Sequence, residues 1–303
     1  MKPSPSPNNH FQHIKKLARS ISIVENDADG YEELLEKLLL KNTQVVGITG
    51  PPGSGKSSIL NRLVQEDYFH NKSICILAID PSSPFNYGAL LGDRIRISSF
   101  PDDRDIYFRS IASRGSLGGL SDKIIEILEV CRSADFDMIF IETVGVGQSE
   151  VEVAGLADTT VVVLTPESGD QVQSMKAGLM EIADIFALNK ADHPAASTFH
   201  KNLQQVLEFK PSESNPPIVE MVATEGEGTS ELLDKILSLK TSRDKSKKVM
   251  LLSDKIYRII QKNRMKMLDK ERIRQDLRNT SDLSTLNIYS FVKERYSDLL
   301  NDR

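Results

Sequence analysis

The stretch VVGITGPPGSGKSSIL, Val45 to Leu60, places a loop of glycines and prolines between an apolar run and a run with helical spacing. Gly50, four intervening residues and then Gly-Lys-Ser match the phosphate-loop pattern. In such a loop, consecutive backbone N–H groups point inward at phosphate oxygens. This requires glycine conformations and no side-chain bulk at Gly50, Gly53 and Gly55. The stretch therefore predicts a strand, a phosphate-binding loop and a helix.

Two polar residues at the exit of the loop support this interpretation. Lys56 would supply a positive charge to the β- and γ-phosphates, and the Ser57 hydroxyl would bind Mg²⁺. The following helix would offer its positive N-terminus to the same phosphates. The alternative is a glycine-rich turn that arises by chance, but the strand before the loop and the helix after it favour phosphate binding.

Short apolar runs alternate with amphipathic runs from Gln44 onward. The strand candidates are 45–49, 73–80, 136–143, 159–165, 183–189 and 217–223. Helical patterns at 56–65, 120–131 and 172–183 lie between them. Strands that are apolar on both faces and alternate with helices indicate an α/β fold, with a predominantly parallel central sheet flanked by helices.

The remaining segments predict extensions at both ends. Residues 1–10 read as a disordered tail and residues 11–43 as an N-terminal helical extension. The nucleotide-binding domain is expected over 44–240. Residues 241–303 form a helical C-terminal arm whose first part is basic, with Leu252, Ile256, Ile259 and Ile260 on one face. We favour dimerisation through this face over RNA or membrane contact.

Composition limits the function classes further. The 303 residues carry a net charge of −5, which gives no general reason to expect nucleic-acid binding. No apolar run approaches the roughly 20 residues needed to span a bilayer, so no membrane role is expected. Cys75 and Cys131 lie in apolar stretches and read as reduced core residues of a cytoplasmic protein. The five histidines are scattered, which disfavours a structural metal site.

The segment ALNKAD, Ala187 to Asp192, addresses which base is bound. The Asp192 carboxylate can accept hydrogen bonds from N1 and the exocyclic N2 of guanine, whereas adenine has an acceptor at N1. A carboxylate left without donors is costly, so this position selects guanine over adenine. Asn189 can bond the base edge, and the stem of Lys190 can cover a ring face. A third base-contacting loop is expected at Val222 to Gly228.

The segment IETVGVGQSE begins at Ile141, after another apolar run. Glu142 is the acidic residue at the end of a strand that can belong to the Mg²⁺ shell, and the Gly145 N–H can reach the γ-phosphate in a nucleotide-dependent switch. A polar loop at the edge of an α/β sheet is the alternative, which the upstream phosphate loop disfavours. The predicted nucleotide contacts are Gly50, Pro51, Pro52, Gly53, Ser54, Gly55, Lys56, Ser57, Ser58, Gly145, Asn189, Lys190, Asp192, Val222, Ala223 and Thr224.

These motifs together resemble the MeaB/ArgK family of P-loop GTPases, in the wider SIMIBI class. The similar stretches lie between Leu17 and Asp192: LARSISIVEN, GITGPPGSGKSS, AIDPSSP, LLGDRIR, SRGSLGGL, IETVGVGQSEVEVAGLAD, SGDQVQSMKAGLMEIAD and NKAD. The resemblance implies a GTP-dependent chaperone that gates cofactor loading and protection of an adenosylcobalamin-dependent acyl-CoA mutase, of the methylmalonyl-CoA mutase type. It also implies a homodimer that binds GTP or GDP with Mg²⁺.

The resemblance extends the predicted site by two residues. Asp80 in AIDPSSP and Asp93 in LLGDR would join Glu142 around Mg²⁺ and the attacking water. The implied catalytic set is Lys56, Asp80, Asp93 and Glu142, and the implied metal set is Ser57, Asp80, Asp93 and Glu142.

Several positions depart from the family pattern. Glu167 stands where a small residue is typical, and Val146 follows Gly145, where it cannot orient water. We therefore expect slow intrinsic GTP hydrolysis that a partner accelerates. Two other classes remain open: a GTPase that inserts metal into hydrogenase or urease, and a nucleotide-dependent small-molecule kinase. Visible metal ligands would favour the first, and adenine binding would favour the second.

Overall fold

The computed structural model contains two compact units, residues 1–245 and 246–303. The described residues are 7–80, 100–101, 103–112, 123–143, 149–168, 179–208, 215–239, 249, 252–253, 255–257, 259–261, 270–280 and 286–296.

A seven-stranded sheet forms the centre of the first unit, in the order β3-β2-β4-β1-β5-β6-β7. Every recorded strand pair is parallel. The strands are β1 (Gln44–Thr49), β2 (Ser73–Asp80), β3 (Asp105–Ala112), β4 (Met138–Glu142), β5 (Thr159–Leu164), β6 (Ile185–Asn189) and β7 (Ile218–Met221). The predicted α/β class with a parallel sheet is confirmed.

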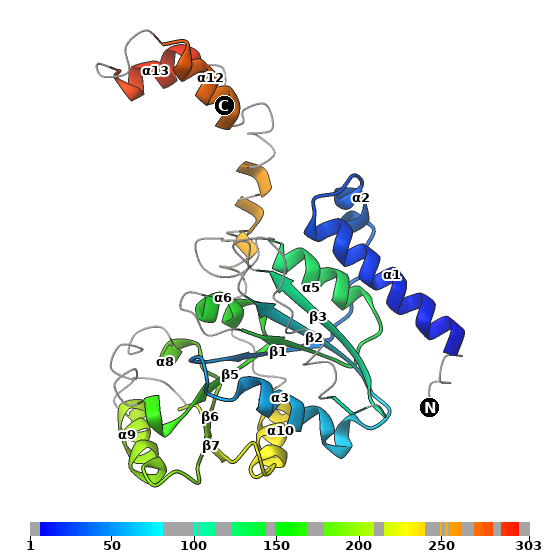
Figure 1. The fold of residues 1–303 in the computed structure, drawn as a ribbon, viewed down its shortest axis with the longest axis vertical. Coiled ribbons are helices and arrows are strands. Elements are labelled where there is room, and N and C mark those ends of the chain that lie inside the picture. The colour runs from blue at the N-terminus through cyan, green and yellow to red at the C-terminus, as the bar shows by residue number, and fades with distance from the viewer. Residues whose placement is uncertain are drawn as a thin grey trace. The chain divides into compact units, whose positions relative to one another are not determined.

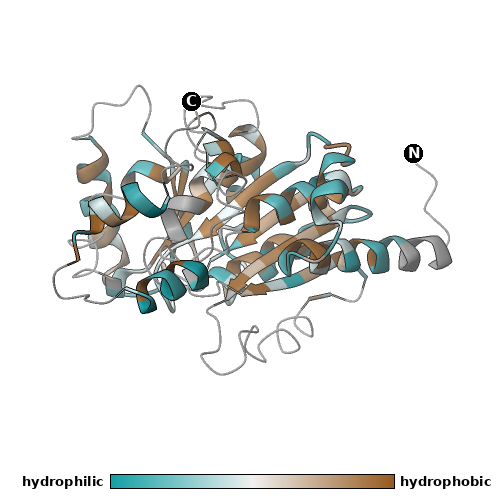
Figure 2. Cartoon of the chain, turned by 90° about the horizontal axis from the view of Figure 1, so that it is seen from above, coloured by the Kyte–Doolittle hydropathy of each residue, from teal (hydrophilic) through white to brown (hydrophobic). Residues whose placement is uncertain are grey.

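Burial explains why the sheet is parallel and central. Every residue of β1, β4, β5 and β6 is buried, as expected of strands covered by helices on both faces. In the hydropathy view, the brown strands lie inside an envelope of mixed and teal helices (Figure 2). The apolar runs read from the sequence therefore correspond to a core with two packed sides.

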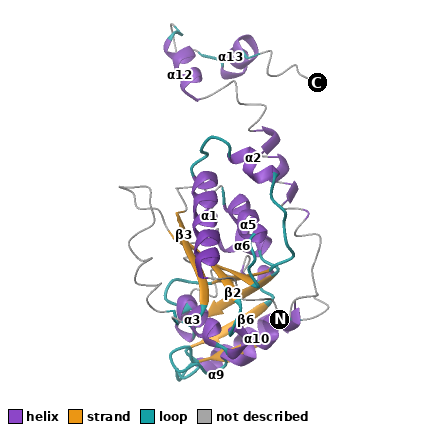
Figure 3. Cartoon of the chain, turned by 90° about the vertical axis from the view of Figure 1, so that its right-hand side faces the viewer, coloured by secondary structure: helices purple, strands orange, loops and turns teal. Residues whose placement is uncertain are grey.

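Helices cover both faces of this sheet (Figures 1 and 3). One face packs on α3 and α10, and the other packs on α1, α5 and α6. The helices of the first unit are α1 (Pro7–Glu25), α2 (Tyr31–Glu36), α3 (Lys56–Gln65), α5 (Ile124–Ser133), α6 (Ser149–Leu156), α8 (Leu179–Ile182), α9 (Ala196–Glu208) and α10 (Thr229–Ser238). Short 3₁₀ turns occur at Asp67–Phe69 and Pro166–Ser168.

The sequence patterns did not predict β3. Arg109 interrupts its apolar residues, and the strand lies at the edge of the sheet, where partial exposure weakens the apolar run. The charge has a partner in the fold, because Arg109 Nη2 donates to Glu25 Oε2 of α1 over 2.8 Å. An ion pair between two distant segments leaves no local sequence pattern.

The chain ends differ from the expected limits in detail. Helix α1 begins at Pro7, so it includes the last residues of the predicted tail. The second unit contains α12 (Lys270–Arg278) and α13 (Ile288–Arg295). The hydroxyl of Tyr296, the residue after α13, donates to Asp276 Oδ2 of α12 over 2.6 Å. Leu252, Ile256, Ile259 and Ile260 are exposed in this unit. The predicted domain limits and the dimer stay predictions.

Candidate nucleotide-binding site

The loop between β1 and α3 has the glycine conformations that its sequence predicts. Gly50, Gly53 and Gly55 have φ angles of 140°, 74° and 91°. A Cβ added at Gly50 would lie 2.2 Å from the carbonyl oxygen of Val163, and one added at Gly55 would lie 2.1 Å from Asn189 Nδ2. These two glycines are therefore required both by backbone conformation and by close packing.

The helix that follows the loop leaves its first N–H groups available to an anion. Gly55 is the N-cap of α3, and no side chain caps the helix. The amide donors of the first turn therefore face the loop together with the positive end of the helix dipole.

Lys56 lies at the same place and is buried. Its ammonium group donates to the carbonyl oxygens of Gly50 over 2.9 Å and Pro51 over 2.8 Å. These bonds fold the side chain back over the loop that it follows. Its charge is thus held above the Gly50–Ser57 segment, as a phosphate-contacting lysine requires.

The Ser57 hydroxyl and the Glu142 carboxylate are brought together by the fold. Ser57 Oγ donates to Glu142 Oε1. The strand register places Glu142, the last residue of β4, beside Ile48, the penultimate residue of β1, at the edge of the sheet from which the loop leads to Ser57. Next to it, the hydroxyls of Thr49 and Thr143 lie 2.9 Å apart.

The other predicted metal and switch residues are less completely described. The backbone of Asp80 ends β2, two residues beyond the Ala78 that pairs with Glu142. This puts Asp80 at the same edge of the sheet as Glu142. Asp93 and Gly145 lie outside the described residues.

The carboxamide of Asn189 connects the phosphate loop to the predicted third base loop. Its Nδ2 donates to the Ser54 carbonyl over 2.9 Å, and its Oδ1 accepts from the Ala223 N–H over 3.1 Å. Asn189 is buried at the end of β6. The base contact predicted for this residue stays a prediction, but the contacts in the structure give it a positioning role.

The loop at 222–228 is closed by its own backbone. The Val222 carbonyl accepts from the N–H groups of Glu225 and Gly226, both over 2.9 Å, and the Val222 N–H donates to Glu227 over 3.2 Å. The Ala223 N–H is used by Asn189. Among the described residues, no acceptor is recorded for the N–H of Thr224, which is exposed.

The two charged residues of the NKAD segment are exposed to different degrees. Lys190 has a positive φ of 58°, and its ammonium group donates to Glu167 Oε2 over 2.7 Å. This hydrogen bond lowers the pKa of the Glu167 carboxyl. Asp192 is exposed two residues further on. The acidic residue that departs from the family pattern is thus the ion-pair partner of the predicted base-stacking lysine.

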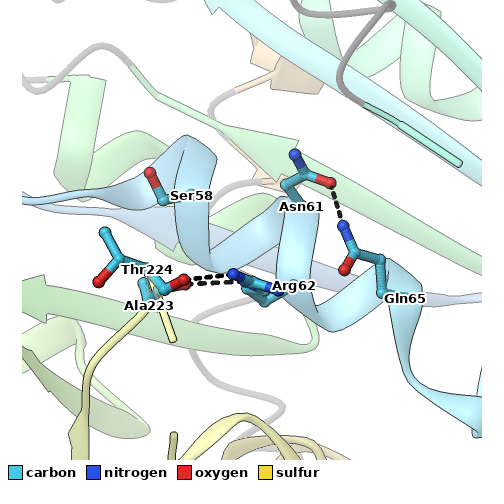
Figure 4. Close-up of a pocket in the computed structure, with 6 residues that line it drawn as sticks. All are labelled: Ser58, Asn61, Arg62, Gln65, Ala223 and Thr224. Atoms are coloured by element: carbon cyan, nitrogen blue, oxygen red, sulfur yellow. Dashed lines mark hydrogen bonds between the residues drawn. The ribbon is translucent and has the colours of Figure 1, made fainter. Parts of the chain in front are cut away.

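Sequence reasoning missed Arg62, which lies on α3 one turn beyond Ser58. Its Nε donates to the Ala223 carbonyl over 2.9 Å, and its Nη2 donates to the Thr224 carbonyl. These residues line a hollow of about 310 Å³ together with Asn61 and Gln65 (Figure 4). The contact joins residues 161 positions apart, so the helical pattern around Arg62 contains no signal for it.

Among the described residues, no group of three or more His, Cys, Asp or Glu side chains could hold a metal ion. Within the same residues, no helix combines the length and the apolar character required to cross a membrane.

Comparison with known proteins identifies the family of this chain. The sequence model described as methylmalonyl Co-A mutase-associated GTPase MeaB matches residues 17–281. A Pyrococcus abyssi protein that is provisionally named a GTPase is 46% identical over 229 residues, which cover 73% of this chain and 71% of that protein. The Escherichia coli GTPase ArgK is 33% identical over 238 residues, covering 75% and 72%.

A solved structure shares the fold. The crystal structure of a LAO/AO transport system kinase superposes with a TM-score of 0.64 at 23% identity, over 98% of this chain and 99% of that one. At this identity the likeness bears on the fold alone.

Proposed function

Because this chain belongs to the MeaB family of methylmalonyl-CoA mutase-associated GTPases, we propose that its GTPase cycle serves an adenosylcobalamin-dependent acyl-CoA mutase. In this proposal the nucleotide lies along the carboxyl edge of the sheet, from the loop at 50–57 to the segments 189–192 and 222–224. The chain acts as a chaperone that gates cofactor loading and protects the mutase.

One observation carries the proposed nucleotide site. The Asn189 side chain bonds the phosphate loop at Ser54 and the third base loop at Ala223. Three segments that were predicted separately therefore meet at one buried carboxamide. Ligands of open parallel sheets bind at this edge, beyond the carboxyl ends of the strands.

The phosphate half of the site is built from the first turn of α3. The backbone N–H groups of the loop and of the helix N-terminus would bind the phosphate oxygens, and Lys56 would exchange its carbonyl contacts for the β- and γ-phosphates. Such preorganised donors stabilise the charge that develops on the transferred phosphoryl group.

The residues near Lys56 also fit a magnesium ion. The Ser57 hydroxyl and the Glu142 carboxylate adjoin each other, and Mg²⁺ is usually held by one or two protein oxygens together with phosphates and water. Asp80 and Asp93 are proposed as further members of this shell. When bound, the ion would neutralise charge on the β- and γ-phosphates.

The base half of the site would select guanine. Asp192 would accept from N1 and N2 of the base, and the N–H of Thr224, an exposed residue, would donate to an acceptor on the base edge. Lys190 would cover one face of the ring with its stem. Gly145 is proposed as the γ-phosphate contact.

The nucleotide part of the proposal is tested with GDP, ADP and xanthosine diphosphate. We expect the chain to bind GDP at least about 100-fold more tightly than ADP, because a site that pairs the polar edge of one base rejects another strongly. Asp192→Asn should reverse the order of GDP and xanthosine diphosphate, since xanthine presents a carbonyl where guanine has its amino group. Equal binding of ADP and GDP would contradict the proposal and favour a kinase.

The partner is tested by co-purification with cobalamin-dependent mutases in the presence of GDP or a non-hydrolysable GTP analogue. We expect retention of a mutase that depends on the nucleotide, and faster single-turnover hydrolysis of GTP when the mutase is present. Light scattering of the chain alone tests the proposed homodimer. If no mutase is retained and Ni²⁺ binds tightly instead, a metal-insertion role replaces this one.

The two buried free thiols, Cys75 and Cys131, are compatible with the reducing cytoplasm that we propose for the chain.

A further inference from the structure

Arg62 joins the helix of the phosphate loop to the third base loop. Its guanidinium group donates through two nitrogens to two successive carbonyl oxygens, those of Ala223 and Thr224. In the close-up, the Arg62 side chain extends from α3 to this loop, while the Asn61 and Gln65 amides bond each other on the same helix (Figure 4). A planar group with several fixed donors suits two neighbouring acceptors.

Because a peptide unit is planar, the contact between Arg62 and the Ala223 carbonyl also fixes the direction of the Thr224 N–H. The Ala223 carbonyl and the Thr224 N–H belong to the same peptide unit, and the structure contains no cis peptide bond among its described residues. In a trans peptide, the C=O and the N–H point in opposite directions. When Arg62 holds the Ala223 oxygen, the Thr224 N–H is directed away from Arg62.

The neighbouring peptide units are held as well. The Ala223 N–H donates to Asn189 Oδ1, and the Glu225 N–H donates to the Val222 carbonyl. Arg62 and Asn189 therefore hold adjacent peptide units of the loop from two different elements, α3 and β6. With these contacts made, the Thr224 N–H lies between peptide units that are held and has no recorded acceptor among the described residues, as is also the case for the N–H groups of Glu227 and Gly228 further along the loop.

We propose that Arg62 is a positioning residue for base recognition: by binding the Ala223 and Thr224 carbonyls it orients the Thr224 N–H toward the nucleotide base. The inference rests on the proposed nucleotide site. Arg62 lies on the helix that begins at the phosphate-contacting Lys56. In this inference, however, Arg62 affects binding of the base and not binding of the phosphates.

The test separates the two halves of the ligand. The full chain is titrated with a fluorescent GDP and, in competition, with inorganic tripolyphosphate, which has no base. The same measurements are made on the variants Arg62→Ala, Arg62→Lys and Gln65→Ala. We expect Arg62→Ala to weaken GDP binding about tenfold, as loss of a charge-assisted hydrogen bond would, and to leave tripolyphosphate binding within about twofold. Arg62→Lys should recover part of the GDP affinity, because an ammonium group can reach one carbonyl but cannot span two in a plane.

The control and the contrary results are distinct. Gln65→Ala changes the same helix and the same hollow and should leave both ligands unaffected. Unchanged GDP binding by Arg62→Ala overturns the inference, and so does an equal loss of GDP and tripolyphosphate binding, which would mean general damage to α3. Failure of the unaltered chain to bind GDP would instead reject the proposed nucleotide site.

Discussion

The phosphate end and the base end of the candidate site are held in different ways. At the phosphate end, the loop is shaped mainly by backbone conformation and close packing, although the Lys56 and Asn189 side chains also bond its carbonyls. Gly50 and Gly55 adopt conformations that other residues avoid, and each packs against an atom that a Cβ would overlap. At the base end, the Asn189 and Arg62 side chains hold the backbone of the loop at 222–228, and Lys190 is paired with the Glu167 side chain. We therefore expect a single substitution at the phosphate end to disrupt the whole loop, whereas a substitution at the base end removes individual hydrogen bonds.

This contrast has a chemical reason. Phosphates are bound mainly by backbone N–H groups, whose directions depend on φ and ψ. A base is recognised by few donors and acceptors at its edge, so the protein needs to orient individual peptide units. Side chains from several elements provide that control, and each can be altered separately.

The largest expected effect tests the backbone-fixed end. In Gly50→Ala, the new Cβ would lie 2.2 Å from the Val163 carbonyl oxygen of β5, which cannot move away without disturbing the sheet. The backbone would also be held at a φ of 140°. We expect the free energy of unfolding to fall by about 3 kcal/mol or more, and GDP binding to be lost. Urea unfolding measures the first quantity and GDP titration the second.

Gly53→Ala is the matched control for this substitution. Gly53 shares the positive φ, but an added Cβ would have no atom of the described chain within 4 Å. We expect a smaller loss of stability, of about 1 kcal/mol, from the backbone conformation alone. Equal losses for the two variants would show that conformation and not packing holds this end.

Much of this first end could be predicted from the sequence, because its determinants are local. The Gly50–Ser57 pattern, the strand before it and the helix after it lie within one continuous stretch. The all-parallel sheet was also readable, since buried strands are apolar along their whole length. Strand β3 was not predicted, because Arg109 interrupts its apolar pattern and pairs with Glu25 of another element, α1.

The base end could be predicted only in part, because its contacts join segments that are far apart in the sequence. The NKAD segment and the loop at 222–228 could be found as polar segments after strands, but their connections could not. Arg62 reaches its carbonyl partners across 161 positions, and a backbone acceptor has no residue type that a pattern could detect. The two contacts that Asn189 makes, with Ser54 and Ala223, likewise depend on the folded arrangement of three loops.

The next largest effect tests the side chain that joins the two ends. Asn189→Ala would remove the donor to the Ser54 carbonyl and the acceptor of the Ala223 N–H, and would leave both groups buried without those bonds. We expect a loss of about 3 kcal/mol in the free energy of unfolding, together with weaker GDP binding. Urea unfolding compares it with Asn61→Ala, whose amide accepts from an exposed glutamine and should cost less than about 0.5 kcal/mol. A similar cost for both variants would mean that Asn189 does not join the two ends.

The smallest effect is expected at the exposed pair of Glu167 and Lys190. The Lys190 hydrogen bond lowers the pKa of Glu167 from its ordinary value of 4.5. A lowered pKa in the folded state means that the pair stabilises the fold above about pH 4.5, and that this contribution disappears as the pH falls through the lowered pKa. Glu167→Gln should therefore unfold at a slightly lower temperature than the unaltered chain at pH 7, and the difference should vanish in acid.

The same variant also tests whether the pair matters for the base. An exposed ion pair is worth little in itself, so any effect of Glu167→Gln on GDP affinity should stay below about threefold if Glu167 only restrains Lys190. Lys190→Met removes the charge but keeps an apolar stem that can cover a ring, and is the control for stacking. A tenfold loss of GDP affinity in Glu167→Gln, without a matching loss in Lys190→Met, would mean that the carboxylate acts on the nucleotide itself. The base end would then depend on charge as well as on oriented peptide units.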